Sequence, residues 1–331
     1  MDNVLTVAID AVRGKIDEKY SANQTSDSLR KAFVEMNGGS TKINPKTFRP
    51  GNALFDLIQE LLPVVIDEGI RTDDNPLFRH VEYRNIADGD AIEFVIDGAS
   101  NFVVATAAAG IQNVRRQRIA GGETKTIPTE VKIVRVYENL GRLLAGRIDF
   151  NTFIDGVAAA FKRYIAEAAY AAFDALSAAT PGLSPTYYKT GSFDEATLLE
   201  LVENVEAATG KTPRIYGTKA ALRKVTSATI AATDAAKDDL YNLGFYGKFY
   251  GTEMISMRQA HKANGAFALN DSKIFVIAGD DQPIKVVNEG EGLLVAHEAT
   301  EKADLTQEYV YAQPMGVGAI CAEKMGVYAI S

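Results

Sequence analysis

Residues 150–180 read FNTFIDGVAAAFKRYIAEAAYAAFDALSAAT and decide the fold of this chain. At 100° per residue, the apolar side chains of this stretch fall within one contiguous stripe, as on an amphipathic helix. They are Phe150, Phe153, Ile154, Val157, Phe161, Tyr164, Ile165, Ala168, Ala172 and Leu176. The charged side chains fall on the opposite face, and eleven alanines between residues 158 and 179 favour a helix. The stretch predicts a long packed helix that is stopped by Thr180-Pro181-Gly182.

A helix of this length spans about 45 Å, which is the diameter of a small domain. Its alanines allow neighbouring elements to approach closely. We interpret the helix as a structural spine and not as a support for catalytic groups.

The segment 84–137, which precedes the spine, has a different period. Apolar and polar side chains alternate there in two runs, which is typical of strands. The apolar members are Ile92, Phe94 and Ile96 in the first run and Val131 and Ile133 in the second. A glycine-containing turn at 120–123 lies between the runs. The segment predicts a long hairpin that is too polar to lie inside a domain.

Composition excludes several classes of protein. With 331 residues, 47% of them hydrophobic, the chain can bury a sizeable core and by length divides into about two domains. The formal charge of −8 opposes non-specific binding to nucleic-acid phosphates. No apolar run reaches the roughly 18 residues that span a bilayer, and the first residues lack a basic signal region, so we expect neither membrane insertion nor secretion. The single cysteine, Cys321, is expected to be a small buried side chain in a reducing cytoplasm.

The residues after the spine alternate between helical and strand patterns. Helices are indicated at 195–208 and 218–225, and strands at 214–216, 273–277 and 283–287, which together predict a compact α+β module. The last forty residues indicate strands near 293–295, 308–312, 317–321 and 326–330. The fold class is therefore α+β.

Three short motifs resemble ligand sites. The turn Gly279-Asp280-Asp281 resembles the metal-binding turn of RNA polymerases, but Gly-Asp-Asp-Gln-Pro is also ordinary hairpin chemistry, which we favour. Gly210-Lys211-Thr212 echoes a phosphate-binding loop, but a helix precedes it, so a helix-ending glycine explains it better. Gly316-Val317-Gly318 begins a dinucleotide fingerprint that fails at Cys321.

The histidines provide no metal site either. His80, His261 and His297 are far apart in sequence, and one cysteine leaves almost no further soft ligands. No serine lies in a nucleophile elbow. The sequence therefore predicts no cofactor, no metal and no enzyme activity, and surface or core positions are expected for the histidines.

Two clusters are candidates for contact between subunits. Arg115, Arg116 and Arg118, with Lys125 on the other side of the turn, form either a solvated hairpin end or a docking site for an acidic neighbour. The stretch 241–251 sets aromatic residues among glycines, which indicates either a contact surface or a glycine-rich core loop. Its candidate contact residues are Tyr246, Phe249 and Tyr250.

The order of these elements resembles the major capsid protein of tailed bacteriophages, a fold that encapsulin shells share. The hairpin 92–137 that leads into the helix at 155–179, the strand Pro213-Arg214-Ile215-Tyr216-Gly217 before a helix, and the terminal strands 309–311 and 326–330 carry the resemblance. It covers essentially the whole chain, although none of these segments is a sharp signature by itself.

The resemblance implies a division of the chain into six segments. They are an N-terminal arm at 1–50, a helical segment of the peripheral domain at 51–83, an extended β-hairpin loop at 84–137, the peripheral domain with the spine helix at 138–189, an axial domain at 190–290 and C-terminal strands at 291–331 that return to the peripheral domain. Some relatives join subunits by a lysine–asparagine bond, for which Lys125 with Asn270 or Asn288 is conceivable here, although no motif marks it.

The function that the resemblance implies is a structural subunit of an icosahedral or prolate head shell around the double-stranded DNA of a phage or prophage. Its partners would be other copies of itself in hexameric and pentameric capsomers, with separate scaffolding, portal, head-completion or decoration proteins, and its location the virion after assembly in the bacterial cytoplasm. An encapsulin-like cargo shell is the alternative with the same fold. A soluble α+β enzyme with an unrecognised site is the alternative from another class.

Overall fold

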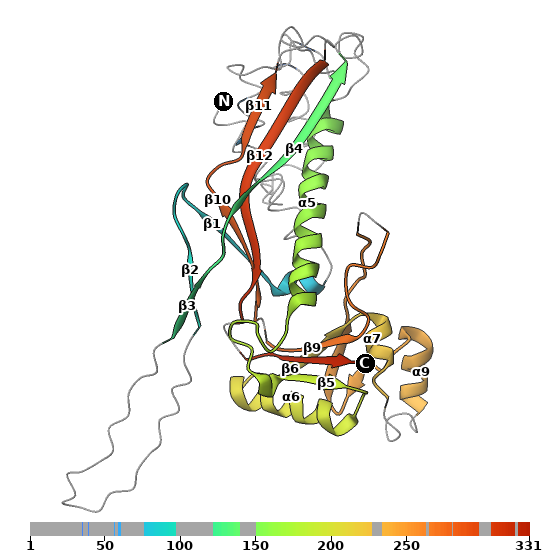
Figure 1. Cartoon of the computed structure of the whole chain (residues 1–331). Helices are drawn as coiled ribbons and strands as arrows, with labels where there is room; N and C mark the ends of the chain where they lie inside the picture. Colours follow the sequence, from blue (N-terminus) through green and yellow to red (C-terminus); the bar gives the residue numbers. More distant parts are fainter. Residues whose placement is uncertain are drawn as a thin grey trace, which may run out of the picture.

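The computed structural model describes residues 76–96, 122–139, 150–226, 234–262, 265–279, 281–297, 306–321 and 324–331, together with Glu35, Gly39, Asp56, Gln59 and Glu60. Most of the predicted arm at 1–50 and most of the helical segment at 51–83 lie outside these residues. Within them, the chain forms two large β-sheets, which are joined by one long helix, α5 (Phe150–Ala175), and a separate two-stranded hairpin (Figure 1).

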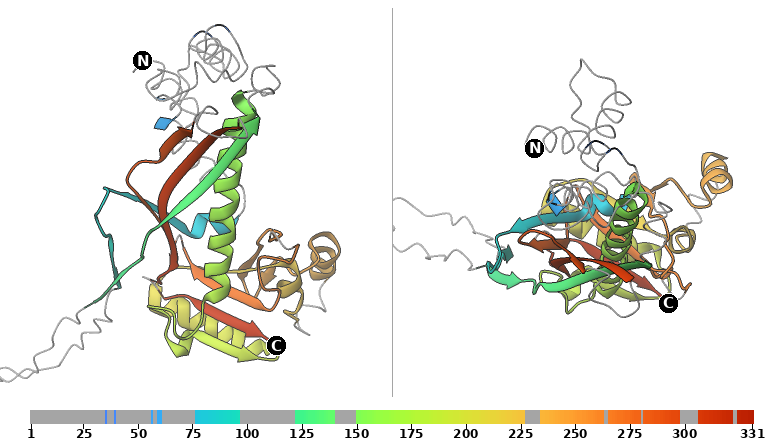
Figure 2. Two further views of the ribbon diagram at one scale, coloured as in Figure 1. Left: turned by 45° about the horizontal axis from the view of Figure 1, so that its top comes forward. Right: turned by 90° about the horizontal axis from the view of Figure 1, so that it is seen from above.

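The first sheet has five strands. Its members are β1 (Val81–Ile86), β10 (Ile284–Glu289), β12 (Thr306–Ala319), β11 (Leu293–His297) and β4 (Glu130–Asn139). The long strand β12 lies in the middle, because β4 pairs with it along one edge while β10 and β11 share the other edge. The helix α5 runs along one face of this sheet (Figure 2).

The second sheet has six strands and carries the smaller helices. In spatial order the strands are β5 (Tyr188–Gly191), β13 (Gly326–Ile330), β9 (Lys273–Ala278), β6 (Pro213–Gly217), β8 (Thr252–Ser256) and β7 (Lys248–Phe249). The helices of this part are α6 (Glu195–Thr209), α7 (Lys219–Arg223) and α9 (Asp234–Leu243), preceded by the short helix η2 (Pro185–Tyr187). Asp194 caps α6 by accepting a hydrogen bond from the Thr197 amide at 3.0 Å, and Gly210 ends it with a positive φ of 65°.

The spine helix confirms much of the predicted stripe and widens it. Val157, Phe161, Ile165 and Leu176 are buried as expected, whereas Tyr164 is 36% exposed. Ala169, Tyr170 and Phe173, which lie outside the predicted stripe, are buried as well. The reason is that the last turns of α5 reach the second sheet, where the Phe173 ring meets Phe275 edge-on at 5.4 Å between centroids.

The helix also ends earlier than residue 180. Its last helical residue is Ala175, and Ser177 and Thr180 form the turn that follows, with the Ser177 amide donating to the Thr180 hydroxyl at 2.9 Å. The Lys273 ammonium of β9 donates to the backbone carbonyls of Asp174 and Leu176. A cation at this position satisfies carbonyls that the helix leaves open and favours the negative end of its dipole.

The predicted hairpin 84–137 is shorter in the structure, because both of its ends belong to the five-stranded sheet. β1 runs parallel to β10 as far as Ile86, and β4 pairs with β12 from Glu130 onward. The described hairpin strands are β2 (Glu93–Ile96) and β3 (Glu123–Thr126), which pair with each other (Figure 1).

Two of the later strands, β10 and β13, belong to other sheets than the sequence predicts. The sequence predicts the strand near 283–287 as part of the α+β module after the spine, but β10 pairs with β1 and β12 in the five-stranded sheet. Conversely, β13 lies between β5 and β9 in the six-stranded sheet. The chain therefore crosses between the two sheets after β9 and again after β12, and the two crossings hold the parts together.

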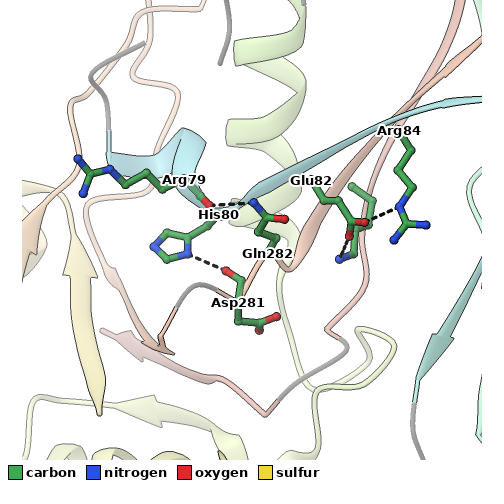
Figure 3. A network of polar contacts seen from close by, with 7 residues as sticks. Arg79, His80, Glu82, Arg84, Asp281 and Gln282 are labelled. Atoms are coloured by element: carbon green, nitrogen blue, oxygen red, sulfur yellow. Dashed lines mark hydrogen bonds and ion pairs between the residues drawn. The ribbon is translucent and has the colours of Figure 1, made fainter. Parts of the chain in front are cut away.

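The start of β1 is attached to the turn before β10 (Figure 3). The short helix η1 (Pro76–His80) leads into β1, and the buried His80 donates from Nδ1 to the Asp281 carbonyl at 2.7 Å. The Gln282 side chain donates to the Arg79 carbonyl at 3.3 Å. The predicted turn reading of this segment is confirmed, since Gly279 leaves β9 with a φ of +60° and β10 follows.

Candidate subunit interface

The register of the five-stranded sheet assigns its side chains to two faces. On β12, Tyr309, Tyr311 and Gln313 point to the face that α5 covers, and all three are buried. The Tyr311 ring meets Phe161 of α5 edge-on, with centroids 5.1 Å apart. Burial raises the pKa of the Tyr309 and Tyr311 hydroxyls above their ordinary value of 10.0, because the interior disfavours a phenolate. This inner face is part of the buried core.

The base of the hairpin covers part of the outer face. Phe94 and Ile96 of β2 are buried against Val287 of β10 and against Ile320, with Ile127 packed beside them. Ile127 and Pro128 cross directly over Gly316 and Gly318 of β12. A Cβ added to Gly316 would lie 2.3 Å from the Pro128 carbonyl oxygen. The two glycines therefore permit this close crossing, which replaces the dinucleotide-site interpretation of the motif.

An ion-pair network attaches the same base to the sheet (Figure 3). Glu82 of β1 accepts from the Lys285 ammonium and from Arg84 Nε at 2.5 Å, and both cations lie over the Phe94 ring. Burial raises the pKa of Glu82, but hydrogen bonds and charges from Lys285 and Arg84 outweigh it, so the net pKa lies below the ordinary value of 4.5.

The rest of the outer face carries exposed apolar side chains. Val131, Ile133 and Tyr137 of β4 are 58%, 59% and 71% exposed, and Leu293 of β11 is 54% exposed. These four residues are called the outer apolar face below. They share one face because Ile133 lies opposite Ala312, which in turn lies opposite Leu293 on the other side of β12.

Several exposed apolar side chains on one sheet face are typical of a surface that another molecule covers. Strands with alternating side chains normally bury the apolar set, and here the buried set of β12 is already on the opposite face. One charged pair lies within this set, since Arg135, 65% exposed, stands between Ile133 and Tyr137 on the same face of β4 and pairs with the buried Glu308.

The sequence-predicted contact residues do not gather at this face. Arg115, Arg116 and Arg118 lie outside the described residues. Lys125 lies on β3, partly exposed, and pairs with Glu123 at 2.5 Å. The predicted contact role is wrong for Phe249, which is fully buried, and for Tyr246, which is 8% exposed, because both belong to the core of the six-stranded part. Tyr250 is 48% exposed and donates to the Glu195 carboxylate, so its contact role stays a prediction.

The residues of the outer apolar face were visible in the sequence as an alternating strand run. Alternation shows that Val131 and Ile133 share a face but not whether that face is covered. Leu293 lies in a predicted strand, but the sequence did not show that it shares a face with Ile133, because this depends on the pairing of both strands with β12.

The predictions for Cys321 and Gly210 are confirmed. Cys321 is buried, and burial first, with the Asp281 charge second, raises the pKa of its thiol to about 12, as for an inert core side chain. Gly210 is a helix-ending glycine as predicted. Among the described residues no group of histidine, cysteine and carboxylate side chains has the arrangement of a metal site, and no described helix is long and apolar enough to cross a membrane.

The arrangement of a spine helix, a sheet with a projecting hairpin and a second α+β sheet defines a phage-type capsid fold. Solved capsid structures have a similar fold. The mature capsid of bacteriophage PhiM1 is similar over 78% of this chain and 88% of that chain, with 9% identity and a TM-score of 0.51. The capsid of cyanophage P-SCSP1u is similar over 76% and 86%, with 13% identity and a TM-score of 0.50. The capsid of an empty GTA particle is similar over 78% and 90%, with 12% identity and a TM-score of 0.50.

The chain belongs to the family described as "SPbeta prophage-derived putative capsid protein YonB", whose model matches residues 3–329. No curated protein sequence matches it. The chain is accordingly a structural subunit of a phage-type head shell. The encapsulin and enzyme alternatives are not favoured by a prophage capsid family.

Proposed function

We propose that copies of this chain associate by covering the outer apolar face of one subunit with the hairpin of the next. The observation that carries the proposal is the division of one sheet face into two parts. The subunit's own hairpin base covers the part over β10 through Phe94 and Ile96, while Val131, Ile133, Tyr137 and Leu293 remain exposed. Apolar area of this kind is removed from water when a second molecule packs on it.

The hairpin of a neighbouring copy suits this face chemically. The sequence between β2 and β3 contains apolar residues (Phe102, Val103, Val104, Ile111 and Val114) as well as the three arginines. In such a contact the apolar residues of the hairpin meet Ile133 and Leu293. Because the hairpin and the face are different surfaces of one chain, the contact is heterologous and generates rings or extended shells.

The finer function follows from repeated contacts of this kind. Subunits form hexameric and pentameric capsomers and close into an icosahedral or prolate shell around double-stranded DNA, in the cytoplasm of a bacterial host and then in the virion. The negative net charge of the chain supports a shell that encloses DNA without sequence-specific binding. Separate scaffolding, portal and head-completion proteins complete the proposed set of partners.

The experiment that tests the proposal replaces Ile133 by glutamate. The side chain is 59% exposed in the subunit, so folding should change by about 0.5 kcal/mol or less, while a charge buried at the contact should block shell formation. Electron microscopy and sedimentation measure assembly, and thermal melting of the unassembled subunit measures folding. Leu293→Glu should have the same effects on folding and on shell formation.

The matched control is Thr190→Glu, which adds the same charge to an exposed position of β5 in the other sheet. It should assemble as the parent does. Normal shells from both Ile133→Glu and Leu293→Glu would exclude the outer apolar face as a subunit contact.

A further inference from the structure

The helix α9 presents an acidic aromatic ridge on the side that faces away from its own core. Ala236 is the buried residue of this helix, and Asp234, Asp238 and Tyr241 lie between about 140° and 200° from it around the helix at 100° per residue. Tyr241 is 90% exposed, which is extreme for so large an aromatic side chain. Figures 1 and 2 show α9 projecting from the six-stranded part.

A pocket of about 530 Å³ lies in the same part of the molecule. Apolar atoms of Met257, Phe267 and Pro76 line it together with two cations, Lys219 and Arg258. Phe267 is 55% exposed at the rim and stacks on His261 with ring centroids 5.2 Å apart. The pocket therefore combines an aromatic wall with positive charge.

One carboxylate inside the pocket limits what it can bind. Asp271 accepts hydrogen bonds from the Thr218 hydroxyl at 2.7 Å and from the Gln259 amide at 3.1 Å, which hold it in place. Its charge opposes a small anion such as phosphate. An aromatic side chain with one flanking carboxylate suits the pocket better, since the ring covers the apolar wall and the carboxylate pairs with a rim cation.

We propose that the ridge of α9 inserts into this pocket on a second copy of the chain. Tyr241 packs against Phe267 and Met257 of the neighbour, and Asp238, three residues earlier on the same helix face, pairs with Lys219. The ridge points away from its own module, so it meets a pocket only on another molecule. Large aromatic anchors in pockets, rimmed by charge pairs, carry much of the energy of protein interfaces.

This contact rests on the proposed function in that both require association between copies, but it uses a different surface. The outer apolar face lies on the five-stranded sheet, whereas the ridge and all of the pocket lining except Pro76 belong to the six-stranded part. Ridge and pocket are again different surfaces, so the contact is head-to-tail and passes around a ring of subunits.

The test is a charge exchange measured by assembly. Asp238→Lys and Lys219→Glu should each lower the yield of shells at least about tenfold, because each places like charges together at every repeat of the contact. The double variant restores the pair in reverse and should recover shell formation. Lys219 is the first residue of α7, where a glutamate is favoured by the helix dipole, so folding should not suffer.

Two further variants test the aromatic part. Tyr241→Ala should reduce shell yield by at least about tenfold, the usual effect of truncating an interface anchor, while Tyr241→Phe keeps the ring and should assemble nearly as the parent does. Glu206→Lys, a charge reversal at an exposed position of α6, is the matched control and should leave assembly unchanged. Circular dichroism and melting of each unassembled variant verify that it is folded.

The outcomes separate this contact from the proposed function. Normal shells from Tyr241→Ala and from both single charge variants overturn the ridge-and-pocket contact and leave shell formation intact. Failure of the double charge variant to recover also overturns the pairing of Asp238 with Lys219. A parent chain that never forms shells overturns the proposed function and this contact together.

Discussion

The ammonium nitrogen of Lys285 lies 5.6 Å from the centre of the Phe94 ring and joins the central sheet to the base of the hairpin. Arg84 lies over the same ring at 5.7 Å, and Glu82 pairs with both cations. This hydrophobic cluster is small, since the side chains of Phe94 and Ile96 pack against Val287, Ile320 and a few half-buried neighbours. The hairpin base is therefore a unit that can open by itself.

Phe94→Ala should open this unit without unfolding the protein. Loss of a buried phenylalanine costs about 3–5 kcal/mol locally, so amide hydrogen exchange in β2 and β3 should accelerate strongly while exchange in α5 is nearly unchanged. Val95→Ala is the control, because Val95 lies on the same strand but is 57% exposed. Equal exchange rates in parent and Phe94→Ala would contradict the attachment through this ring.

The Glu82 network predicts a pH dependence. The folded-state pKa of Glu82 lies below 4.5, so its contribution to stability is complete above the unfolded-state pKa and is lost as the pH falls through the folded value. The free energy of unfolding of the subunit, measured by urea denaturation between pH 7 and pH 3, should fall less steeply below pH 4.5 in Glu82→Gln than in the parent. Glu203→Gln, an exposed position on α6, should keep the parent slope.

Two glycine-to-alanine substitutions should have opposite signs. Gly316→Ala places a methyl group 2.3 Å from the Pro128 carbonyl oxygen and should destabilise the subunit by about 1–3 kcal/mol, since the backbone must move. Gly156→Ala in α5 meets no atom within 4 Å and should stabilise it by about 0.5–1 kcal/mol through helix propensity. Denaturant titration measures both. A neutral Gly316→Ala would show that the chain crossing at Pro128 is loose.

The cap that Lys273 provides to α5 should matter more than an exposed ion pair. Lys273→Met removes the donor to the Asp174 and Leu176 carbonyls and should cost about 1–3 kcal/mol, because these hydrogen bonds are charged and half-buried. Lys237→Met removes an exposed pair with Asp234 and should cost about 0.5 kcal/mol or less. The unassembled Lys273→Met variant should therefore melt at a lower temperature than Lys237→Met. The reverse order would contradict the capping role of Lys273.

The arginines near the hairpin turn lie outside the described residues, so their role stays a prediction from sequence. Replacing Arg115, Arg116 and Arg118 together by glutamate should leave the circular dichroism and melting of the subunit close to the parent's. Shell formation should fail or require high salt, since like charges would face the acidic neighbour. Parent-like shells at low salt would exclude electrostatic docking, and an unfolded subunit would show that this segment belongs to the core.

The sequence by itself determined the features that depend on local pattern. The apolar period of 150–176 identified the spine, because a helix brings Val157, Phe161 and Ile165 to one side whatever surrounds it. Gly210 was recognisable as a helix end because its backbone hydrogen bond is local, to Glu206 four residues earlier. The order of such elements was enough to indicate the capsid fold.

Only the tertiary structure decided which surfaces are open. Sequence spacing does not reveal that β4 pairs with β12, more than 160 residues away, and this pairing is what leaves Ile133 uncovered on the same face as Leu293. The same limit applies to Phe249 and Tyr250, which are adjacent in sequence, yet one is fully buried and the other is 48% exposed. Burial depends on what packs from distant segments, and a local pattern specifies the face of a strand or helix but not what lies against it.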